Sequence, residues 1–208
     1  MRSFGCALVI RLFCLAASLA ASAQTFKTLA RFKSGNDPAY VTLAQDRDGN
    51  LWGTTEYGGY GTVFRVTPTG GLSNVINFDG FDGSYPLAGL VLGRDNNLYG
   101  VTPYGGSNSP DGPGVVFKVS PSGVLTVLHN FDGPDGFYAQ GALVQATDGN
   151  FYGTTKLGGT ITCVVSNCGT IFKITPNGTL TVLYQFDFTH GGDPAAGLVR
   201  RVGTGNRW

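Results

Sequence analysis

The sequence DGNLWGTT at residues 48–55 recurs as DNNLYGVT at 95–102 and as DGNFYGTT at 148–155. The three segments align without gaps, and a Gly-Gly pair follows each of them. A second shared segment comes next in each copy: GTVFRVTPTG (61–70), GVVFKVSPSG (114–123) and GTIFKITPNG (169–178). Self-similarity at a period of about 50 residues is typical of repeat architectures. The chain is therefore a tandem array of one structural unit.

Each copy is expected to form four short strands. In the second copy, residues 87–93 are an apolar run typical of a strand covered on both faces, and residues 98–102 follow after a turn. Residues 115–120 show strand-like alternation, and residues 125–131 follow a Pro-Ser-Gly turn. Four antiparallel strands per repeat predict an all-β, β-propeller-like array of four-stranded blades. A parallel β-helix is the alternative, although its coils repeat with a much shorter period.

The repeats define the expected domain organisation. The tandem β repeats occupy residues 24–200, with full copies at approximately 33–78, 79–131 and 132–186 and a partial copy at 187–200. Because propellers need at least about four blades, three full copies predict an incomplete ring.

The ends of the array depart from the repeat. TFKTLARF (25–32) is similar to a fourth strand that has no blade before it, and residues 201–208 form an off-pattern tail. We expect a gene product that is truncated or frameshifted near Arg201. An open array of repeats is the alternative.

The composition excludes several other classes of protein. Glycine accounts for 33 of 208 residues, and charged residues for 13% against about 25% in typical domains. Gly, Thr and Asp are poor helix formers, which argues against a helical bundle. A hydrophobic content of 42% argues against disorder, and a formal net charge of +1 lacks the basic excess of a nucleic-acid binder. A β-rich globular protein with no nucleic-acid partner is the remaining class.

Residues 1–23 are typical of a secretory signal peptide. Arg2 and Arg11 supply positive charge, residues 12–20 an apolar core, and residues 21–23 a small-residue cleavage site. The core is shorter than the ~20 residues that span a bilayer, and no second run of that length follows. We expect a secreted protein (extracellular, at the cell surface or in the periplasm) with no membrane span in the mature chain. An uncleaved N-terminal anchor is the alternative.

Signal cleavage would leave two cysteines, Cys163 and Cys168. In a secreted chain, two cysteines so close in sequence are most simply joined in a disulfide that closes one loop. Metal binding or free thiols are the alternatives, but neither His129 nor His190 lies close enough in sequence to be an obvious further ligand.

The second copy carries a resemblance to a known family. FDGFDGSYPLAGLVLGRDNNLYGVTPYGG (78–106) followed by GVVFKVSPSGVLTVL (114–128) resembles the GloVer-type tandem repeat of secreted bacterial "choice-of-anchor" proteins. The resemblance covers about residues 25–200. It implies a longer array that ends in a cell-surface or sorting anchor, of which this sequence shows no recognisable trace. It implies no particular activity.

Acidic loops separate the copies and could bind a metal ion. FDGFDG and FDGPDG place four carboxylates among glycines: Asp79, Asp82, Asp132 and Asp135. Flexible oxygen-rich loops can bind Ca²⁺, which takes six to eight oxygen ligands, so these four residues are candidate calcium ligands. The alternative is that each loop is an ordinary turn in which the carboxylate accepts hydrogen bonds from nearby backbone amides.

Aromatic residues recur at three repeat positions. They are Trp52, Tyr99 and Tyr152; Phe64, Phe117 and Phe172; and Phe78, Phe131 and Phe186. Aromatic platforms can stack on sugars, but equivalent rings in every copy are expected to pack between blades.

Catalytic motifs are not found in the sequence. It contains no G-x-S-x-G, no H-E-x-x-H and no P-loop, and the single glutamate, Glu56, is replaced by Pro103 and Lys156 in the other copies. We expect a secreted or cell-surface repeat protein with a structural or binding role, no enzymatic activity and no cofactor. Loops 107–113 and 160–168 would present it to an extracellular protein or glycan. The alternative is an extracellular propeller enzyme, a polysaccharide lyase or hydrolase with its site near the ring axis.

Overall fold

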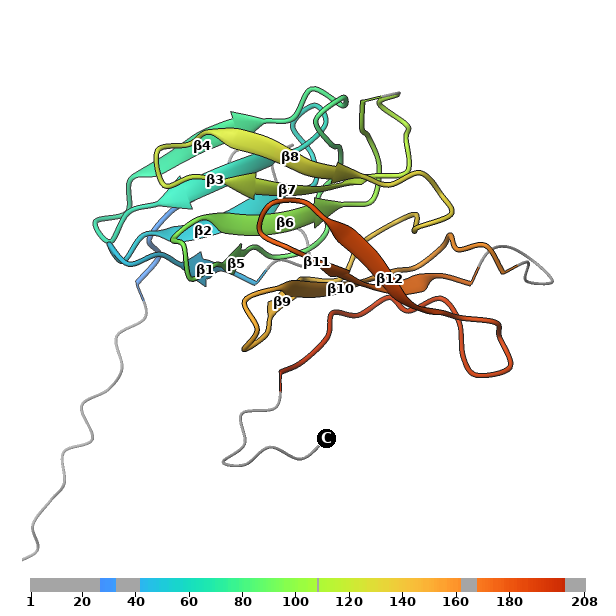
Figure 1. Ribbon diagram of the computed structural model, residues 1–208. Coiled ribbons are helices and arrows are strands. Elements are labelled where there is room, and N and C mark those ends of the chain that lie inside the picture. The colour runs from blue at the N-terminus through green and yellow to red at the C-terminus, as the bar shows by residue number, and fades with distance from the viewer. Residues whose placement is uncertain (1–26, 33–41, 108, 162–167, 201–208) are drawn as a thin grey trace, which may run out of the picture.

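The computed structural model describes residues 27–32, 42–107, 109–161 and 168–200. These residues form three four-stranded antiparallel sheets, here called blades one, two and three, which follow one another along the chain (Figure 1). Within each blade the strands pair in sequence order. The predicted all-β, propeller-like fold is confirmed, and within the described ranges the blades do not close into a ring. No helix in the described ranges is long and apolar enough to cross a bilayer.

The strand bounds repeat closely from blade to blade. Blade one contains β1 (Ala44–Gln45), β2 (Leu51–Thr55), β3 (Thr62–Val66) and β4 (Leu72–Asn77). Blade two contains β5 (Val91–Leu92), β6 (Leu98–Thr102), β7 (Val115–Val119) and β8 (Leu125–Asn130). Blade three contains β9 (Val144–Gln145), β10 (Phe151–Thr155), β11 (Thr170–Ile174) and β12 (Leu180–Gln185).

The first strand of each blade is shorter than the sequence predicts. The apolar run 87–93 contributes only the two residues of β5, whereas the other strands of blade two lie within one residue of their expected bounds. Residues before β5 bond across the blade boundary instead, since the Tyr85 amide donates to the Tyr60 carbonyl at 2.8 Å. A Cβ on Gly89 would lie 2.5 Å from the Thr42 carbonyl oxygen. The segments that lead into the first strands of neighbouring blades therefore contact each other through their backbones.

A glycine faces a phenylalanine between the second and third strands of every blade. Gly53 pairs with Phe64, Gly100 with Phe117, and Gly153 with Phe172. A Cβ on Gly100 would lie 2.5 Å from Cζ of Phe117, and the other two pairs match it within 0.1 Å. The ring thus covers the glycine backbone, as aromatic residues do opposite glycines in other sheets. All three phenylalanines are buried.

Each fourth strand carries a β-bulge at the same place. The register shifts leave one residue of that strand unpaired: Val75, Leu128 and Leu183. Such bulges bend the strand and redirect a side chain. Here the extra residue lies against the turn between the third and fourth strands of the next blade. A Cβ on Gly123, in the β7–β8 turn, would lie 2.6 Å from Cγ1 of Val75. A Cβ on Gly178, in the β11–β12 turn, would lie 2.4 Å from the Leu128 carbonyl oxygen.

Aromatic side chains join neighbouring blades. The rings of Phe78 and Phe117 meet edge to face with centroids 5.3 Å apart, and Phe131 meets Phe172 in the same way at 5.4 Å. Tyr99 stacks on Phe151 at 3.9 Å between blades two and three. Such pairs contribute about 0.5–1.5 kcal/mol beyond their buried area. The expected packing of aromatic residues between blades is confirmed at both described boundaries.

Residues 27–32 cover the free side of blade one. Phe32 meets Phe64 edge to face with centroids 4.8 Å apart, the geometry seen at the two blade boundaries. A Cβ on Gly70 would lie 2.6 Å from the Leu29 carbonyl oxygen. Residues 27–32 therefore pack on blade one as β4 packs on blade two and as β8 packs on blade three.

Substitution of Gly100 by alanine is expected to destabilise the protein by about 1–3 kcal/mol, the usual cost of overpacking a core. The new methyl group would meet Phe117, and it would also lie 2.8 Å from Cδ2 of Leu90. Urea unfolding measures the loss. Combining Gly100→Ala with Phe117→Leu should recover part of the loss, because the shorter side chain vacates the space; strictly additive losses would contradict the steric explanation.

Candidate functional site

Two sets of loops lie at one end of the array. Thr55 at the end of β2 pairs with Thr62 at the start of β3, which pairs with Asn77 at the end of β4. The β2–β3 loop and the β4–β5 connection therefore leave blade one at the same end. The registers of blades two and three repeat this arrangement. We call this end the loop face.

Five aromatic side chains form a continuous row on the loop face, here called the tyrosine row: Tyr60, Tyr85, Tyr104, Phe137 and Tyr138. Successive ring centroids along the four tyrosines are 6.1, 6.3 and 5.0 Å apart, and the rings meet edge to face. All five residues are half-buried, so the rings are held in place while part of each remains open to solvent. The row runs from the β2–β3 loop of blade one to the connection that enters blade three.

Backbone strain orients two members of the row. Tyr85 and Tyr138 have φ angles of 54° and 64°, and Asp193, at the equivalent position of the next copy, has 51°. The left-handed region is uncommon for bulky residues and costs on the order of 1 kcal/mol. Hydrogen bonds hold this conformation, since Tyr85 donates its amide to Tyr60 and the Lys156 amide donates to the Tyr138 carbonyl at 3.0 Å. Strain of this kind is concentrated at binding and catalytic sites in proteins.

A lysine and two tyrosines lie side by side at the blade-three end of the row. Nζ of Lys156 lies 5.7 Å from the centroid of the Tyr138 ring, within range of a cation–π interaction. Burial raises the pKa of Tyr104, and the neighbouring Tyr138 raises it further, while Lys156 acts in the opposite direction. Tyr104 is therefore a neutral phenol at physiological pH and can both donate and accept hydrogen bonds.

A cavity of about 360 Å³ lies near this row, where four repeat copies, including the partial one, each contribute one lining residue. It is lined by Glu56, Leu87, Gln140 and Ala195. Leu87 and Gln140 each follow a strained tyrosine of the row by two residues. The Glu56 carboxylate accepts hydrogen bonds, and the Gln140 amide both accepts and donates them. The cavity therefore adds polar groups to an aromatic surface.

The four predicted calcium ligands lie in two turns on the loop face. Asp79 and Asp82 exchange hydrogen bonds, each backbone amide donating to the other residue's Oδ1 at 2.9 and 3.0 Å. Asp132 and Asp135 do the same at 3.0 and 3.1 Å. Each pair is thus brought together, but among the described residues no group of three or more His, Cys, Asp or Glu side chains is placed to hold a metal ion. The hydrogen bonds are those of ordinary Asp turns. Calcium binding there stays a prediction.

The two acidic turns differ in their electrostatics. Nε2 of His129 lies 2.5 Å from Oδ2 of Asp135, whereas the equivalent neighbour of Asp82 is the apolar Ile76. Burial acts to raise the pKa of Asp135, but the hydrogen bond with His129 and backbone donors outweigh it, so the pKa is lowered. Burial, and then repulsion from Asp79, raise the pKa of Asp82. The sequence indicates only a core or edge role for His129, because its partner lies beyond a turn.

The predicted disulfide lies partly outside the described residues. Cys168 is buried, and Cys163 is outside the described ranges, as are the expected signal peptide (1–23) and most of loop 160–168. The pairing of Cys163 with Cys168 stays a prediction.

Loop 107–113, predicted as a contact surface, borders the tyrosine row. The Pro110 carbonyl accepts a hydrogen bond from Oγ of Ser84 at 3.0 Å, and the Pro113 carbonyl accepts one from the Tyr138 amide at 3.3 Å. The row itself is missed by sequence reasoning. The available signal is the recurrence of tyrosine at positions 85 and 138, which are equivalent in the repeat.

Substitution of Asp135 by asparagine is expected to lower the free energy of unfolding by about 1–3 kcal/mol at pH 7, because His129 loses a charged hydrogen-bond partner in a partly buried site. Asp82→Asn is the matched control. It keeps an oxygen for the turn and removes the repulsion from Asp79, so it should be neutral or stabilising. Urea unfolding of both variants checks the prediction, and equal losses would contradict it.

The Asp135 contribution is also expected to depend on pH. The folded-state pKa lies below the unfolded value of about 3.9, so the stabilisation is fully present above that pH and is lost as the pH falls through the folded pKa. The stability difference between the wild type and Asp135→Asn should therefore shrink between about pH 4 and pH 2. Thermal unfolding across this range measures it; a constant difference would assign the effect to packing.

Several solved structures are similar to part of the chain. A protein assigned as a gluconolactonase is 17% identical with a TM-score of 0.47, covering 69% of this chain and 48% of that chain. A luciferin-regenerating enzyme is 15% identical with a TM-score of 0.42, covering 70% and 45%. The extracellular domain of a protein described as a hybrid two-component system from B. thetaiotaomicron is 18% identical with a TM-score of 0.47, covering 79% and 19%. The chain spans less than half of each of these structures, and similarity at this level says nothing about activity.

The sequence comparison with protein families gives a broader match. No curated protein matches the chain. The family model of the Gloeobacter/Verrucomicrobia repeat matches residues 16–206, which include all the described blades. With the repeated strands, registers and Gly–Phe pairs described above, this match shows that the chain belongs to the Gloeobacter/Verrucomicrobia repeat family.

Proposed function

We propose that the chain is a secreted or cell-surface binding protein that holds a glycan on the tyrosine row. The observation that carries the proposal is the row itself: four tyrosines and a phenylalanine in continuous contact, half-buried, two of them held in a strained backbone conformation. Rings that served only to fill a core would be covered, as Trp52 and Tyr99 are.

The chemistry of the row suits a saccharide. Aromatic faces carry partial negative charge and attract the weakly positive C–H face of a sugar ring. Tyrosine also brings a hydroxyl that exchanges hydrogen bonds with sugar hydroxyls. Because the rings follow one another across two blade boundaries, the row offers successive platforms. Such an arrangement favours an extended glycan chain over a compact small molecule.

The groups beside the row extend this polar contact. Glu56 and Gln140 line the adjoining cavity and supply hydrogen-bond acceptors and donors. Lys156 at the blade-three end supplies a positive charge, which favours glycans that carry carboxylate or sulfate groups. A glycosidase needs two carboxyl groups on either side of the scissile bond, and the cavity lining contains one, that of Glu56. These groups support binding; the expectation that the chain lacks enzymatic activity stays a prediction.

The expected extracellular location agrees with this partner. A signal peptide at residues 1–23 would deliver the chain to the compartment where structural and capsular polysaccharides are found. A disulfide between Cys163 and Cys168 would be stable there.

Glycan binding is tested by affinity electrophoresis against a panel of neutral and acidic polysaccharides, followed by titration calorimetry with the best ligand. Tyr104→Ala is expected to weaken binding at least tenfold, which is about 1.4 kcal/mol. Tyr104→Phe should retain most of the affinity if stacking dominates. Tyr184→Ala, on exposed β12 outside the row, is the control and should bind like the wild type.

Two outcomes would overturn the proposal. If no polysaccharide retards the protein in the gel, the chain does not bind a glycan. If Tyr104→Ala and Tyr184→Ala weaken binding equally, the tyrosine row is not the binding site. Circular dichroism of each variant shows that the fold is retained.

A further inference from the structure

One repeat position at the loop face carries a different charge in each copy. It is the first residue after the second strand of a blade, and it is Glu56 in blade one, Pro103 in blade two and Lys156 in blade three. Because the second strands end at the loop face, all three residues lie at that end of the array. The repeat therefore places a negative charge, no charge and a positive charge there in succession.

Lys156 lies at the blade-three end of the tyrosine row and acts on two of its rings. Its backbone amide donates to the Tyr138 carbonyl at 3.0 Å, and its Nζ lies 5.7 Å from the centroid of the Tyr138 ring. Burial and then Tyr138 raise the pKa of Tyr104, and the positive charge of Lys156 acts against them. A saccharide lying on Tyr104 and Tyr138 would therefore lie within reach of this charge.

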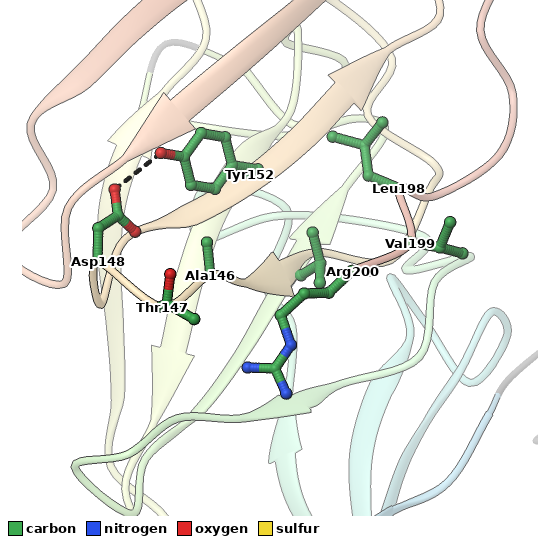
Figure 2. Close-up of a pocket in the computed structure, with 8 residues that line it drawn as sticks. Ala146, Thr147, Asp148, Tyr152, Leu198, Val199 and Arg200 are labelled. Carbon is green, nitrogen blue, oxygen red and sulfur yellow. Dashed lines mark hydrogen bonds between the residues drawn. The ribbon is translucent and has the colours of Figure 1, made fainter. Parts of the chain in front are cut away.

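The second lysine of blade three already has a carboxylate of the protein nearby. Lys173 pairs with Tyr152 between β11 and β10, at the end of the blade opposite to the loop face. There the Tyr152 hydroxyl donates to Asp148 at 2.8 Å, beside a pocket of about 410 Å³ (Figure 2). Hydrogen bonds from Asn150 and Tyr152, and then the charge of Lys173, lower the pKa of Asp148. By contrast, Lys156 forms no ion pair with a described residue, so a carboxylate on a ligand can serve as its partner.

Several acidic side chains lie on the same face as the row. Glu56 begins the β2–β3 loop that carries Tyr60, is half-buried and lines the cavity near the row. The turns that precede Tyr85 and Tyr138 add two carboxylates each. Like charges brought together at an interface cost affinity and exclude the wrong partner. A glycan with a carboxylate on every sugar would therefore be repelled along most of the row.

We propose that the tyrosine row selects a sparsely charged glycan, with a single carboxylate-bearing sugar on Tyr138 against Lys156 and neutral sugars on the preceding rings. Lys156 attracts the carboxylate, and Glu56 excludes a second one from the blade-one end of the row. This assignment rests on the proposed glycan function and names the class of glycan: a neutral chain with an occasional uronic acid, as opposed to a polyuronate.

Titration calorimetry with matched galacturonan hexamers tests this selection. One hexamer is fully methyl-esterified and neutral, two carry a single free carboxylate at one end or the other, and one carries a free carboxylate on every sugar. The better of the two singly charged hexamers should bind at least about fivefold more tightly than the neutral hexamer, which is about 1 kcal/mol. The fully charged hexamer should bind less tightly than that singly charged one. Raising the salt concentration to about 1 M, where the Debye length is about 3 Å, should remove the preference.

Substitutions assign the preference to single side chains. Lys156→Gln should lower the affinity for the singly charged hexamer to that for the neutral hexamer and leave the neutral hexamer unaffected, whereas Lys156→Arg should keep the preference. Glu56→Gln should tighten binding of the fully charged hexamer by about threefold or more, because it removes a like charge. Lys173→Gln is the matched control. It removes the same charge from the opposite end of blade three and should leave every affinity unchanged.

The proposal fails if the fully charged hexamer binds most tightly, if all the hexamers bind alike, or if Lys156→Gln weakens the neutral and singly charged hexamers equally. It also fails if no hexamer binds while a polysaccharide of the panel does, and the glycan proposal then stands. If neither the hexamers nor any polysaccharide binds, both proposals fail. Hexamer binding that Tyr104→Ala leaves unchanged would place the site away from the row and would likewise overturn both.

Discussion

A phenylalanine ring lying over bare glycine backbone is the contact on which this array depends. Gly53, Gly100 and Gly153 lack the Cβ that would meet the ring of the adjacent strand. The ring then lies close to the sheet, and its edge reaches a phenylalanine of the preceding element, at 4.8 Å for Phe32, 5.3 Å for Phe78 and 5.4 Å for Phe131. One interaction within a blade thereby creates the interface between blades.

Because this contact lies in the core of the blades, the side chains of the loop face can differ between copies. Tyr85, Tyr138 and Asp193 share a positive φ, so the backbone repeats while the side chain changes. The turns that contain Asp82 and Asp135 show the same division, since the reciprocal hydrogen bonds recur in both, but of these two residues Asp135 alone has a histidine partner. A repeat of this kind keeps its geometry through the core and can vary its chemistry at one end.

Much of the fold is predictable from the sequence, because the repeat is compared with itself three times. The bounds of β6 and β10 follow directly from the aligned LYGVT and FYGTT segments. The length of β5 does not follow. The run 87–93 is apolar throughout, but its early residue Ala88 accepts a hydrogen bond from Thr54 of blade one, and no local pattern records a partner in another repeat. The candidate site is less predictable for the same reason, since Tyr60 and Tyr104 are not equivalent in the repeat: Tyr104 precedes its Gly-Gly pair, whereas Tyr60 follows the pair of blade one.

By itself the sequence determines the repeat, the four strands in each copy, the Asp turns and the set of residues that pack between blades. These follow from local propensities and from glycine and aromatic positions that are visible in each copy. Tertiary structure alone decides that residues 27–32 cover blade one, that His129 meets Asp135, and that the tyrosines form one row. Each of these depends on the distance between segments that are brought together only when the blades pack, and that distance is set by the whole array.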